Sequence, residues 1–202
     1  MDTRRLEAFS DGVFAVAITI LALSLAVDGP GHGSLLSQLG ARWPEFASYV
    51  VSFFIIGIAW VNHHTLLCRF ATVDRVLLFL NLVLLLFIVL IPFATSTMAT
   101  YLTADNTDAH IAGALYGAVL EGMACGFVLI FLHAVRKRRL SESVPPRALR
   151  MALLRFGLGL LVYLVAIGVA FISAPIALAL IAAAATYYIF EHRPIAEAFV
   201  GD

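Results

Sequence analysis

Long apolar stretches alternate with short polar segments along this chain. Each apolar stretch is close to the roughly 20 residues that an α-helix needs to cross a bilayer. The polar segments are rich in Gly, Pro, Asp and Arg, which end helices or stay in water. The pattern predicts an all-α, polytopic membrane protein with a single six-span domain over residues 1–202. The predicted spans cover residues 6–27, 44–68, 76–99, 110–135, 149–172 and 176–190.

Smaller features refine this pattern. Residues 28–33 break the first span, and a short amphipathic piece over residues 35–39 is expected on the surface. Pro44 suits the first turn of the second span. The fourth span contains two small-xxx-small steps, which begin at Gly113 and Gly122 and allow close helix approach. We expect these steps to serve ordinary packing within the subunit.

Composition supports the membrane interpretation. Hydrophobic residues make up 62% of the chain and charged residues 13%, with a mean hydropathy of +0.98. A soluble domain is nearer a quarter charged. The formal net charge is zero, so no overall field points to a nucleic-acid partner.

The placement of lysine and arginine predicts the orientation. With six spans both termini lie on one side, and that side holds every Lys and Arg except Arg42. Because cytoplasmic loops carry the excess of basic residues, we expect both termini in the cytoplasm. The protein is then a multi-pass protein of the cell membrane.

The first span carries polar residues where a bilayer disfavours them. Ser10 and Asp11 enter it early, and an intramembrane carboxylate needs a partner or a function. Successive residues of an α-helix are 100° apart, so residues that lie within about 60° of one line along the helix form a stripe. One such stripe is apolar except for a single hydroxyl. It consists of Gly12, Val16, Thr19, Ile20, Leu23 and Val27. Ser10 and Asp11 lie more than about 100° from this line, so they face other neighbours.

Two interpretations of the stripe are open. It is either a packing surface, in which Thr19 bonds only to its own helix, or the wall of a pore. Hydrophobic constrictions gate pores by dewetting, and a ring of hydroxyl groups replaces part of an ion's hydration shell.

The second span carries the motif Trp60-Val61-Asn62-His63-His64. Trp60, His63 and His64 lie at i, i+3 and i+4, so they share one helix face. We expect them to lie at a similar membrane depth to Ser10 and Asp11. We expect Asp11 to contact His63 or His64, with Ser10 and the Trp60 indole nearby. Such a network is either structural or sensitive to pH.

The remaining candidate residues are isolated. Glu121 is either a proton-coupling site or a protonated acid bonded to a neighbouring helix. Asn62 and Asn81 suit hydrogen bonds between helices. Cys68 and Cys125 form no metal-binding spacing or disulfide framework, so we expect small buried apolar side chains. No hydrolase, nucleotide-binding or cysteine–histidine motif appears, and the histidines are too few for a membrane di-iron site.

The run from Phe9-Ser10-Asp11 to Thr19, preceded by Arg5, resembles the signature of the transmembrane protein 175 family of potassium channels. The tryptophan–histidine motif of that family matches Trp60 and its two histidines. The resemblance covers essentially the whole chain, although the first two spans carry the specific motifs. It implies a homotetramer whose first helices line the pore, without a re-entrant filter loop.

The resemblance also assigns roles to individual residues. Val16, Ile20 and Leu23 match the family's hydrophobic constriction, and Thr19 matches its threonine layer. The family often has isoleucine or leucine at the narrowest layer, so valine at position 16 implies a wider or less selective constriction. A structural polar network is expected from Arg5, Phe9, Ser10, Asp11, Trp60, His63 and His64.

The expected function is that of a potassium-preferring cation channel in a prokaryotic plasma membrane. No cofactor and no resident metal are expected, and K⁺ binds only transiently near Thr19. The alternative is a proton-coupled secondary transporter that uses the intramembrane carboxylates Glu121 and Asp11. A membrane protein without conduction is a third class, and an enzyme is not expected.

Overall fold

The computed structural model describes residues 3–70, 72–104, 106–137 and 146–190. Its regular elements are helices. In chain order they are α1 (Thr3–Leu21), the 3₁₀ helix η1 (Ala22–Ser24), α2 (Leu35–Ala41), α3 (Trp43–Leu67), α4 (Arg75–Tyr101), α5 (Thr107–Arg136), α6 (Pro146–Ala170) and α7 (Ala174–Phe190). The predicted all-α fold is confirmed. The long helices coincide with the apolar stretches, and α2 coincides with the short surface piece.

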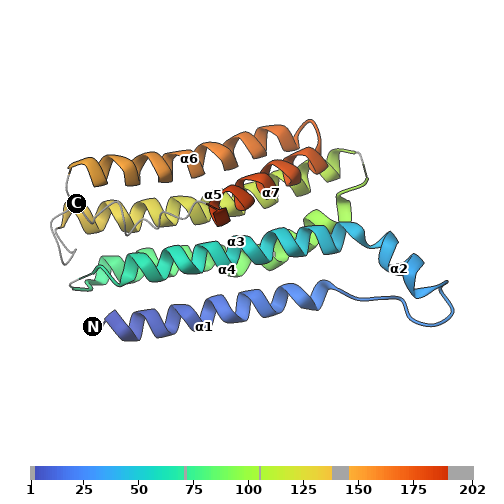
Figure 1. The fold of residues 1–202 in the computed structure, drawn as a ribbon, viewed down its shortest axis with the longest axis horizontal. Helices are drawn as coiled ribbons and strands as arrows, with labels where there is room; N and C mark the ends of the chain where they lie inside the picture. Colours follow the sequence, from blue (N-terminus) through green and yellow to red (C-terminus); the bar gives the residue numbers. More distant parts are fainter. Residues whose placement is uncertain (1–2, 71, 105, 138–145, 191–202) are drawn as a thin grey trace.

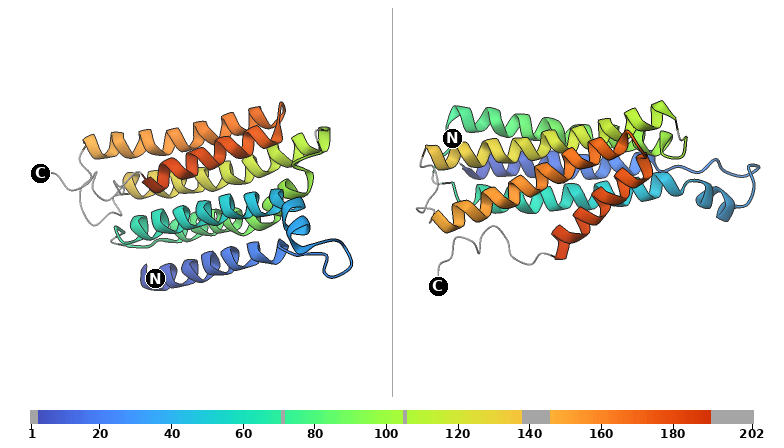
Figure 2. Two further views of the ribbon diagram at one scale, coloured as in Figure 1. Left: turned by 45° about the vertical axis from the view of Figure 1, so that its right-hand side comes forward. Right: turned by 90° about the horizontal axis from the view of Figure 1, so that it is seen from above.

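The long helices lie side by side in one bundle, and α2 projects beyond one end of it (Figure 1). Helix α4 packs chiefly against α5, and α5 packs also against α6. Helix α1 contacts α3 and α4, and Figure 2 shows it along one edge of the bundle. This edge position leaves one side of α1 free of the rest of the subunit.

Four described helices are long and apolar enough to cross a membrane, namely α1 with η1, α3, α4 and α5. The apolar segments Phe156–Ala170 of α6 and Ala174–Phe190 of α7 are shorter. Large apolar side chains on the outside of α4, such as Phe79, Leu86 and Phe93, are exposed. Such a surface is typical of membrane contact.

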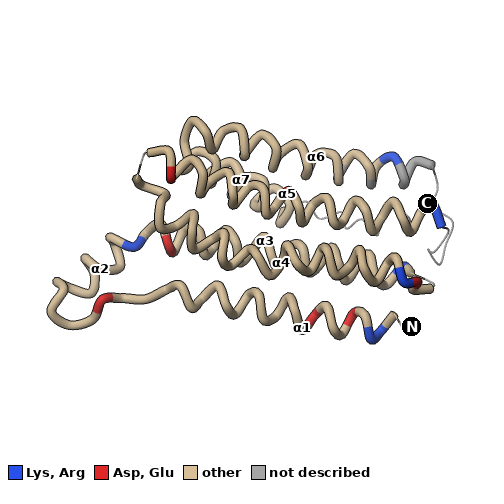
Figure 3. The backbone as a smooth tube through the Cα atoms, turned by 180° about the vertical axis from the view of Figure 1, so that it is seen from behind, with Lys and Arg blue, Asp and Glu red and all other residues tan. Residues whose placement is uncertain are grey.

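Most of the charged residues drawn in Figure 3 lie toward the two ends of the bundle, whereas Asp11 and Glu121 lie further along α1 and α5. The described Lys and Arg residues lie at the end that holds the N-terminus, except Arg42, which lies beside α2 at the other end. Arg42 pairs there with Asp28 at 2.5 Å. The basic residues Arg138, Arg139 and Arg193 lie outside the described residues.

Polar side chains and glycines fix the ends of the helices. Asp74 caps α4 by accepting a hydrogen bond from the Leu77 amide at 2.8 Å, and Asn106 caps α5 in the same way. Pro44 lies in the first turn of α3, as predicted. The loop before α2 turns at Gly29, Gly31 and Gly33, whose φ angles are 86°, 102° and 93° and which therefore lie in the region that favours glycine.

The first span ends earlier than predicted. The α-helix stops at Leu21, and η1 completes it. The Leu25 amide bonds to the Ala22 carbonyl at 3.1 Å, which is a 3₁₀ contact, and Leu25 itself is extended. Val27 therefore lies outside the helix, and the expectation that it extends the helical stripe is wrong. Hydropathy alone placed Val27 in the span, because apolar residues continue past the point where helical hydrogen bonding ends.

Small residues bring α5 close to its neighbours. A Cβ atom added at Gly113 would lie 3.0 Å from Ala170 Cβ on α6. One added at Gly126 would lie 3.1 Å from Leu84 Cα on α4. The predicted use of these steps for packing within the subunit is confirmed.

A buried hydroxyl cluster, which the sequence pattern does not predict, joins three helices inside the bundle. Ser52 Oγ on α3 lies 2.7 Å from Thr95 Oγ1 on α4 and 2.8 Å from the Tyr116 hydroxyl on α5. These bonds satisfy polar groups inside the bundle, and they leave α1 out.

Candidate functional site

Helix α1 has one buried and one exposed face. The buried face repeats at intervals of three or four residues, which is the helical period, and consists of Leu6, Ser10, Phe14, Ala17 and Leu21. The predicted stripe lies on the other side, where Val16 is 54% and Ile20 is 41% exposed in the single chain. Leu23 continues the stripe in η1 and is 80% exposed. Packing inside the subunit therefore does not account for the stripe.

Thr19 lies on the exposed face, and its hydroxyl donates a hydrogen bond to the Val16 carbonyl at 2.8 Å. A hydroxyl has one donor and two acceptor lone pairs. Because the donor is used within the helix, the oxygen remains an acceptor. A back-bonded threonine on this face is thus suited to contact a cation.

A buried relay of hydrogen bonds joins α1, α4 and α3. The Ser10 hydroxyl donates to the Leu6 carbonyl at 2.9 Å, and the Asn81 amide donates to Ser10 Oγ at 3.0 Å. His63 Nε2 lies 2.7 Å from Asn81 Oδ1. Ser10, Asn81 and His63 each have 0% exposure. The predicted interhelical role of Asn81 is confirmed.

The relay determines the tautomer of His63. An amide oxygen only accepts hydrogen bonds, so His63 Nε2 must carry the proton and donate to Asn81. His63 Nδ1 is left as a buried acceptor without a partner among the described residues. The ring packs against Phe14 of α1, with the centroids 5.3 Å apart. His63 is therefore held by both a hydrogen bond and an aromatic contact.

Asp11 bonds to α3 through a different partner from the one predicted. The Trp60 indole Nε1 donates to Asp11 Oδ1 at 2.9 Å. The expectation of a contact with His63 or His64 is wrong, because His63 pairs with Asn81 and His64 pairs with Glu7. Successive residues on a helix are about 100° apart, so a fully buried Ser10 places Asp11 at the rim of the interface. The long indole of Trp60 reaches that rim.

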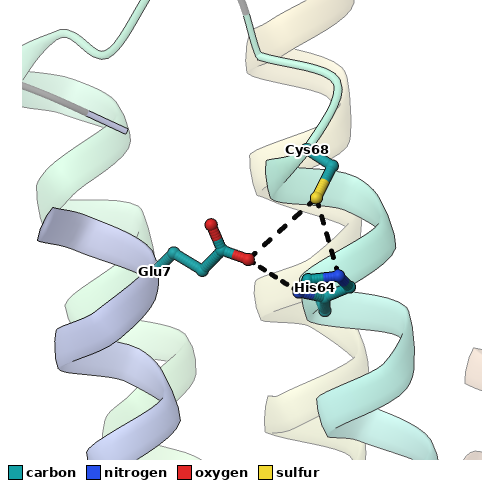
Figure 4. Close-up of side chains that lie close together, drawn as sticks. All are labelled: Glu7, His64 and Cys68. Carbon is teal, nitrogen blue, oxygen red and sulfur yellow. Dashed lines mark hydrogen bonds and ion pairs between the residues drawn. The ribbon is translucent and has the colours of Figure 1, made fainter. Parts of the chain in front are cut away.

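Glu7 was not among the predicted site residues. Its Oε1 lies 2.6 Å from His64 Nδ1, and Cys68 Sγ lies 3.7 Å from His64 Nε2 (Figure 4). Cys68 and Cys125 are both exposed, so the prediction that they are buried is wrong. The available signal was spacing, because Glu7 lies one turn before Asp11 and His64 one turn after Trp60.

The two remaining predicted network residues lie on the surface of the single chain. Phe9 is 54% exposed. Arg5 is exposed and has no ion-pair partner among the described residues. Neither takes part in the hydrogen bonds that join α1 to α3 and α4.

Glu121 lies on α5, away from the relay. Cys125 Sγ, one turn further along the same helix, lies 3.9 Å from Glu121 Oε1. Glu121 Oε2 is buried without a hydrogen-bond partner among the described residues. The expected bond from Glu121 to a neighbouring helix is therefore not made within this part of the chain.

Known proteins are similar to this chain in sequence. The family model described as endosomal/lysosomal potassium channel TMEM175 matches residues 5–92, a segment that contains Ser10, Asp11, Trp60, His63 and Asn81. A potassium channel of Streptomyces collinus is 45% identical over 198 residues, which covers 96% of this chain and 95% of that protein. The chain belongs to the TMEM175 family.

Other members of the TMEM175 family extend the comparison. The crystal structure of a lysosomal potassium-selective channel TMEM175 homolog from Chamaesiphon minutus matches with a TM-score of 0.80 and 31% identity, over 93% of this chain and 96% of that chain. The human relative is named an endosomal/lysosomal proton channel, and it is 34% identical over 144 residues, 67% of this chain and 26% of that protein. The family is one of membrane ion channels rather than enzymes, as expected.

Proposed function

We propose that this chain forms a homotetrameric, potassium-preferring cation channel whose pore is lined by α1. Each subunit contributes one six-span domain over residues 1–202, with α6 and α7 as the last two spans. The protein lies in the cell membrane of a prokaryote with both termini in the cytoplasm, because the basic end of the bundle faces the cytoplasm. Relatives named potassium channels support this proposal.

The single observation that carries the proposal is the pair of opposed faces on α1. The face toward the subunit is closed by the buried relay and by apolar packing. The other face is an apolar stripe with one hydroxyl, and the rest of the subunit leaves it exposed. A helix at the edge of a bundle, fixed from behind in this way, is suited to line a central axis between copies.

The stripe contains the parts that a simple filter needs. Val16, Ile20 and Leu23 form a hydrophobic constriction, in which an ion loses water at a cost in free energy. The Thr19 oxygen, which is free to accept, replaces part of the lost hydration and contacts K⁺ transiently. Neither step needs a resident metal or a cofactor.

The polar residues behind the stripe position α1 and do not contact the ion. Ser10 is buried against α4, and Asp11 accepts from Trp60 at the rim. Arg5 and Phe9 extend the same region toward the neighbouring subunit of the tetramer. This division assigns conduction to one face of α1 and assembly to the rest.

The test is bilayer recording of the purified protein under bi-ionic K⁺/Na⁺ conditions. We expect Thr19→Val to shift the reversal potential toward zero. Thr186→Val is the matched control, because Thr186 is also exposed and back-bonded, to Ala182 at 2.8 Å, but lies on α7. An unchanged reversal potential for Thr19→Val would remove Thr19 from the filter. A current that no substitution in the stripe alters would contradict the proposal that α1 lines the pore.

Proton-coupled transport is the second candidate. It is favoured by the Glu121 oxygen that is buried without a hydrogen-bond partner among the described residues. Counterflow in proteoliposomes separates the two candidates, because a transporter gives saturable exchange whereas a channel gives unitary currents. Glu121→Gln abolishes coupled exchange if Glu121 carries the proton. It leaves unitary K⁺ currents in place if α1 forms the pore.

A further inference from the structure

Three potential metal ligands meet where the basic ends of α1 and α3 lie side by side (Figure 4). Glu7 belongs to α1, whereas His64 and Cys68 lie at the end of α3. One ligand atom from each of them lies within 4.8 Å of the others. No other such group of three occurs among the described residues.

The fold explains why these side chains converge. His64 and Cys68 are four residues apart, so they lie on the same face of α3. The Cys68 amide still bonds to the His64 carbonyl at 3.0 Å, which extends the helical register to the cysteine. Glu7 approaches from the facing turn of α1, one turn before the Asp11–Trp60 contact. Neighbouring contacts thus hold both helices in place around the cluster.

The cluster is accessible at the end of the bundle. The side chain of His64 is 51% exposed and that of Glu7 is 22% exposed. The Cys68 thiol is also exposed. An ion in the aqueous phase on this side can therefore reach all three groups.

The donor set selects the class of ion. A thiolate, an imidazole and a carboxylate together suit Zn²⁺, whereas Mg²⁺ and Ca²⁺ prefer oxygen ligands alone. Three protein ligands leave one position of a tetrahedron open for water. We propose that Glu7, His64 and Cys68 form a Zn²⁺ site that ties α1 to α3.

Binding requires only local rearrangement. Glu7 now contacts His64 Nδ1, and Cys68 lies nearer to Nε2, with 4.0 Å between Cys68 Sγ and Glu7 Oε1. A metal takes a single ring nitrogen, so coordination replaces the Glu7–His64 hydrogen bond while the side chains turn. The backbone positions already bring the three groups together. This inference does not depend on conduction, because binding is measured directly.

The first experiment titrates Co²⁺, as a coloured substitute for Zn²⁺, into the purified full-length protein after treatment with a chelator. We expect one equivalent per chain and a thiolate-to-cobalt charge-transfer band. Cys68→Ser removes that band. Cys125→Ser, the matched control on α5, retains it, because Cys125 lies beside Glu121 and not in this cluster. A wild-type protein without the band, or a band that Cys68→Ser retains, overturns the proposal.

The second experiment measures Zn²⁺ affinity against a chromophoric chelator. Loss of a residue that only hydrogen-bonds to a metal ligand costs about 10–100-fold in metal affinity. Glu7→Gln removes a ligand itself, so we expect it to weaken Zn²⁺ binding at least about tenfold. Zn²⁺ also slows alkylation of Cys68, but not of Cys125, in the unmutated protein. Equal alkylation rates with and without Zn²⁺ contradict the site even if a variant fails to fold.

Discussion

Asn81 on α4 donates a hydrogen bond to the hydroxyl of Ser10 on α1 at 3.0 Å, and both side chains are fully buried. The same amide accepts from His63 of α3 through its oxygen. One side chain on α4 thereby holds the proposed pore helix and its support together. A buried polar network of this kind is costly when it is only partly satisfied.

Ser10→Ala should therefore destabilise the protein. The substitution leaves a buried N–H of Asn81 without its acceptor, which costs about 1–3 kcal/mol, so the apparent melting temperature in detergent falls. Ser96→Ala is the control, because Ser96 is exposed on the same helix that carries Asn81. Asn81→Leu combined with Ser10→Ala should cost less than the two single changes together. Strict additivity would argue that the relay does not act as a unit.

Trp60→Phe should weaken the attachment of Asp11 without opening the core. The change removes the indole donor at 2.9 Å but keeps an aromatic ring, and Trp60 is 43% exposed. We expect a loss of about 0.5–1.5 kcal/mol, measured by thermal unfolding. Trp43→Phe, at the start of the same helix and 50% exposed, should have no effect. If Trp60→Phe costs as much in an Asp11→Ala background, which lacks the acceptor, the bond is not the cause.

Substitutions at Val16 should change conduction in opposite directions. Val16→Leu narrows the proposed constriction and should lower the unitary conductance while raising the preference for K⁺ over Na⁺. Val16→Ala should do the reverse, because a wider pore strips less water from the ion. Val89→Ala is the control, since Val89 is 49% exposed on α4, compared with 54% for Val16. Equal conductance in all three variants would place the constriction elsewhere.

Gly126→Ala should separate α4 from α5. The added Cβ would lie 3.1 Å from Leu84 Cα, and a backbone atom yields less than the tip of a side chain. Overpacking of this kind costs about 1–3 kcal/mol, measured as a lower melting temperature. Gly57→Ala on α3 is the matched control, because no atom lies within 4 Å of the Cβ it adds. Helix propensity favours alanine at both sites, so a stable Gly126→Ala variant would disprove the close contact.

Hydropathy predicted most of the fold, because each helix follows from its own run of residues. The position of Pro44 in the first turn of α3 and the separate piece α2 were both predicted. The end of α1 was not, since η1 forms where apolar residues continue but helical hydrogen bonding stops. Local composition predicts reliably that a helix forms, but it predicts the residue at which the helix ends less reliably.

The candidate site was predicted in part. Helical geometry alone put Ser10 and Asp11 on a different side of α1 from Val16 and Thr19, and the structure has that division. It also put Trp60 beside α1, where its indole meets Asp11. The predicted partner of Asp11 was wrong. An ion pair between Asp11 and a histidine is chemically favourable, but the sequence does not give the distances between the helices.

The sequence by itself determined the helices, the membrane class of the protein and the two faces of α1, since each depends on periodicity within one segment. Only the tertiary structure decided that Asn81 bridges Ser10 and His63, and that Glu7 joins His64 and Cys68. Such contacts depend on the rotation and depth of each helix relative to its neighbours. A shift of one residue turns a side chain by about 100°, so partner choice is a property of the packed bundle.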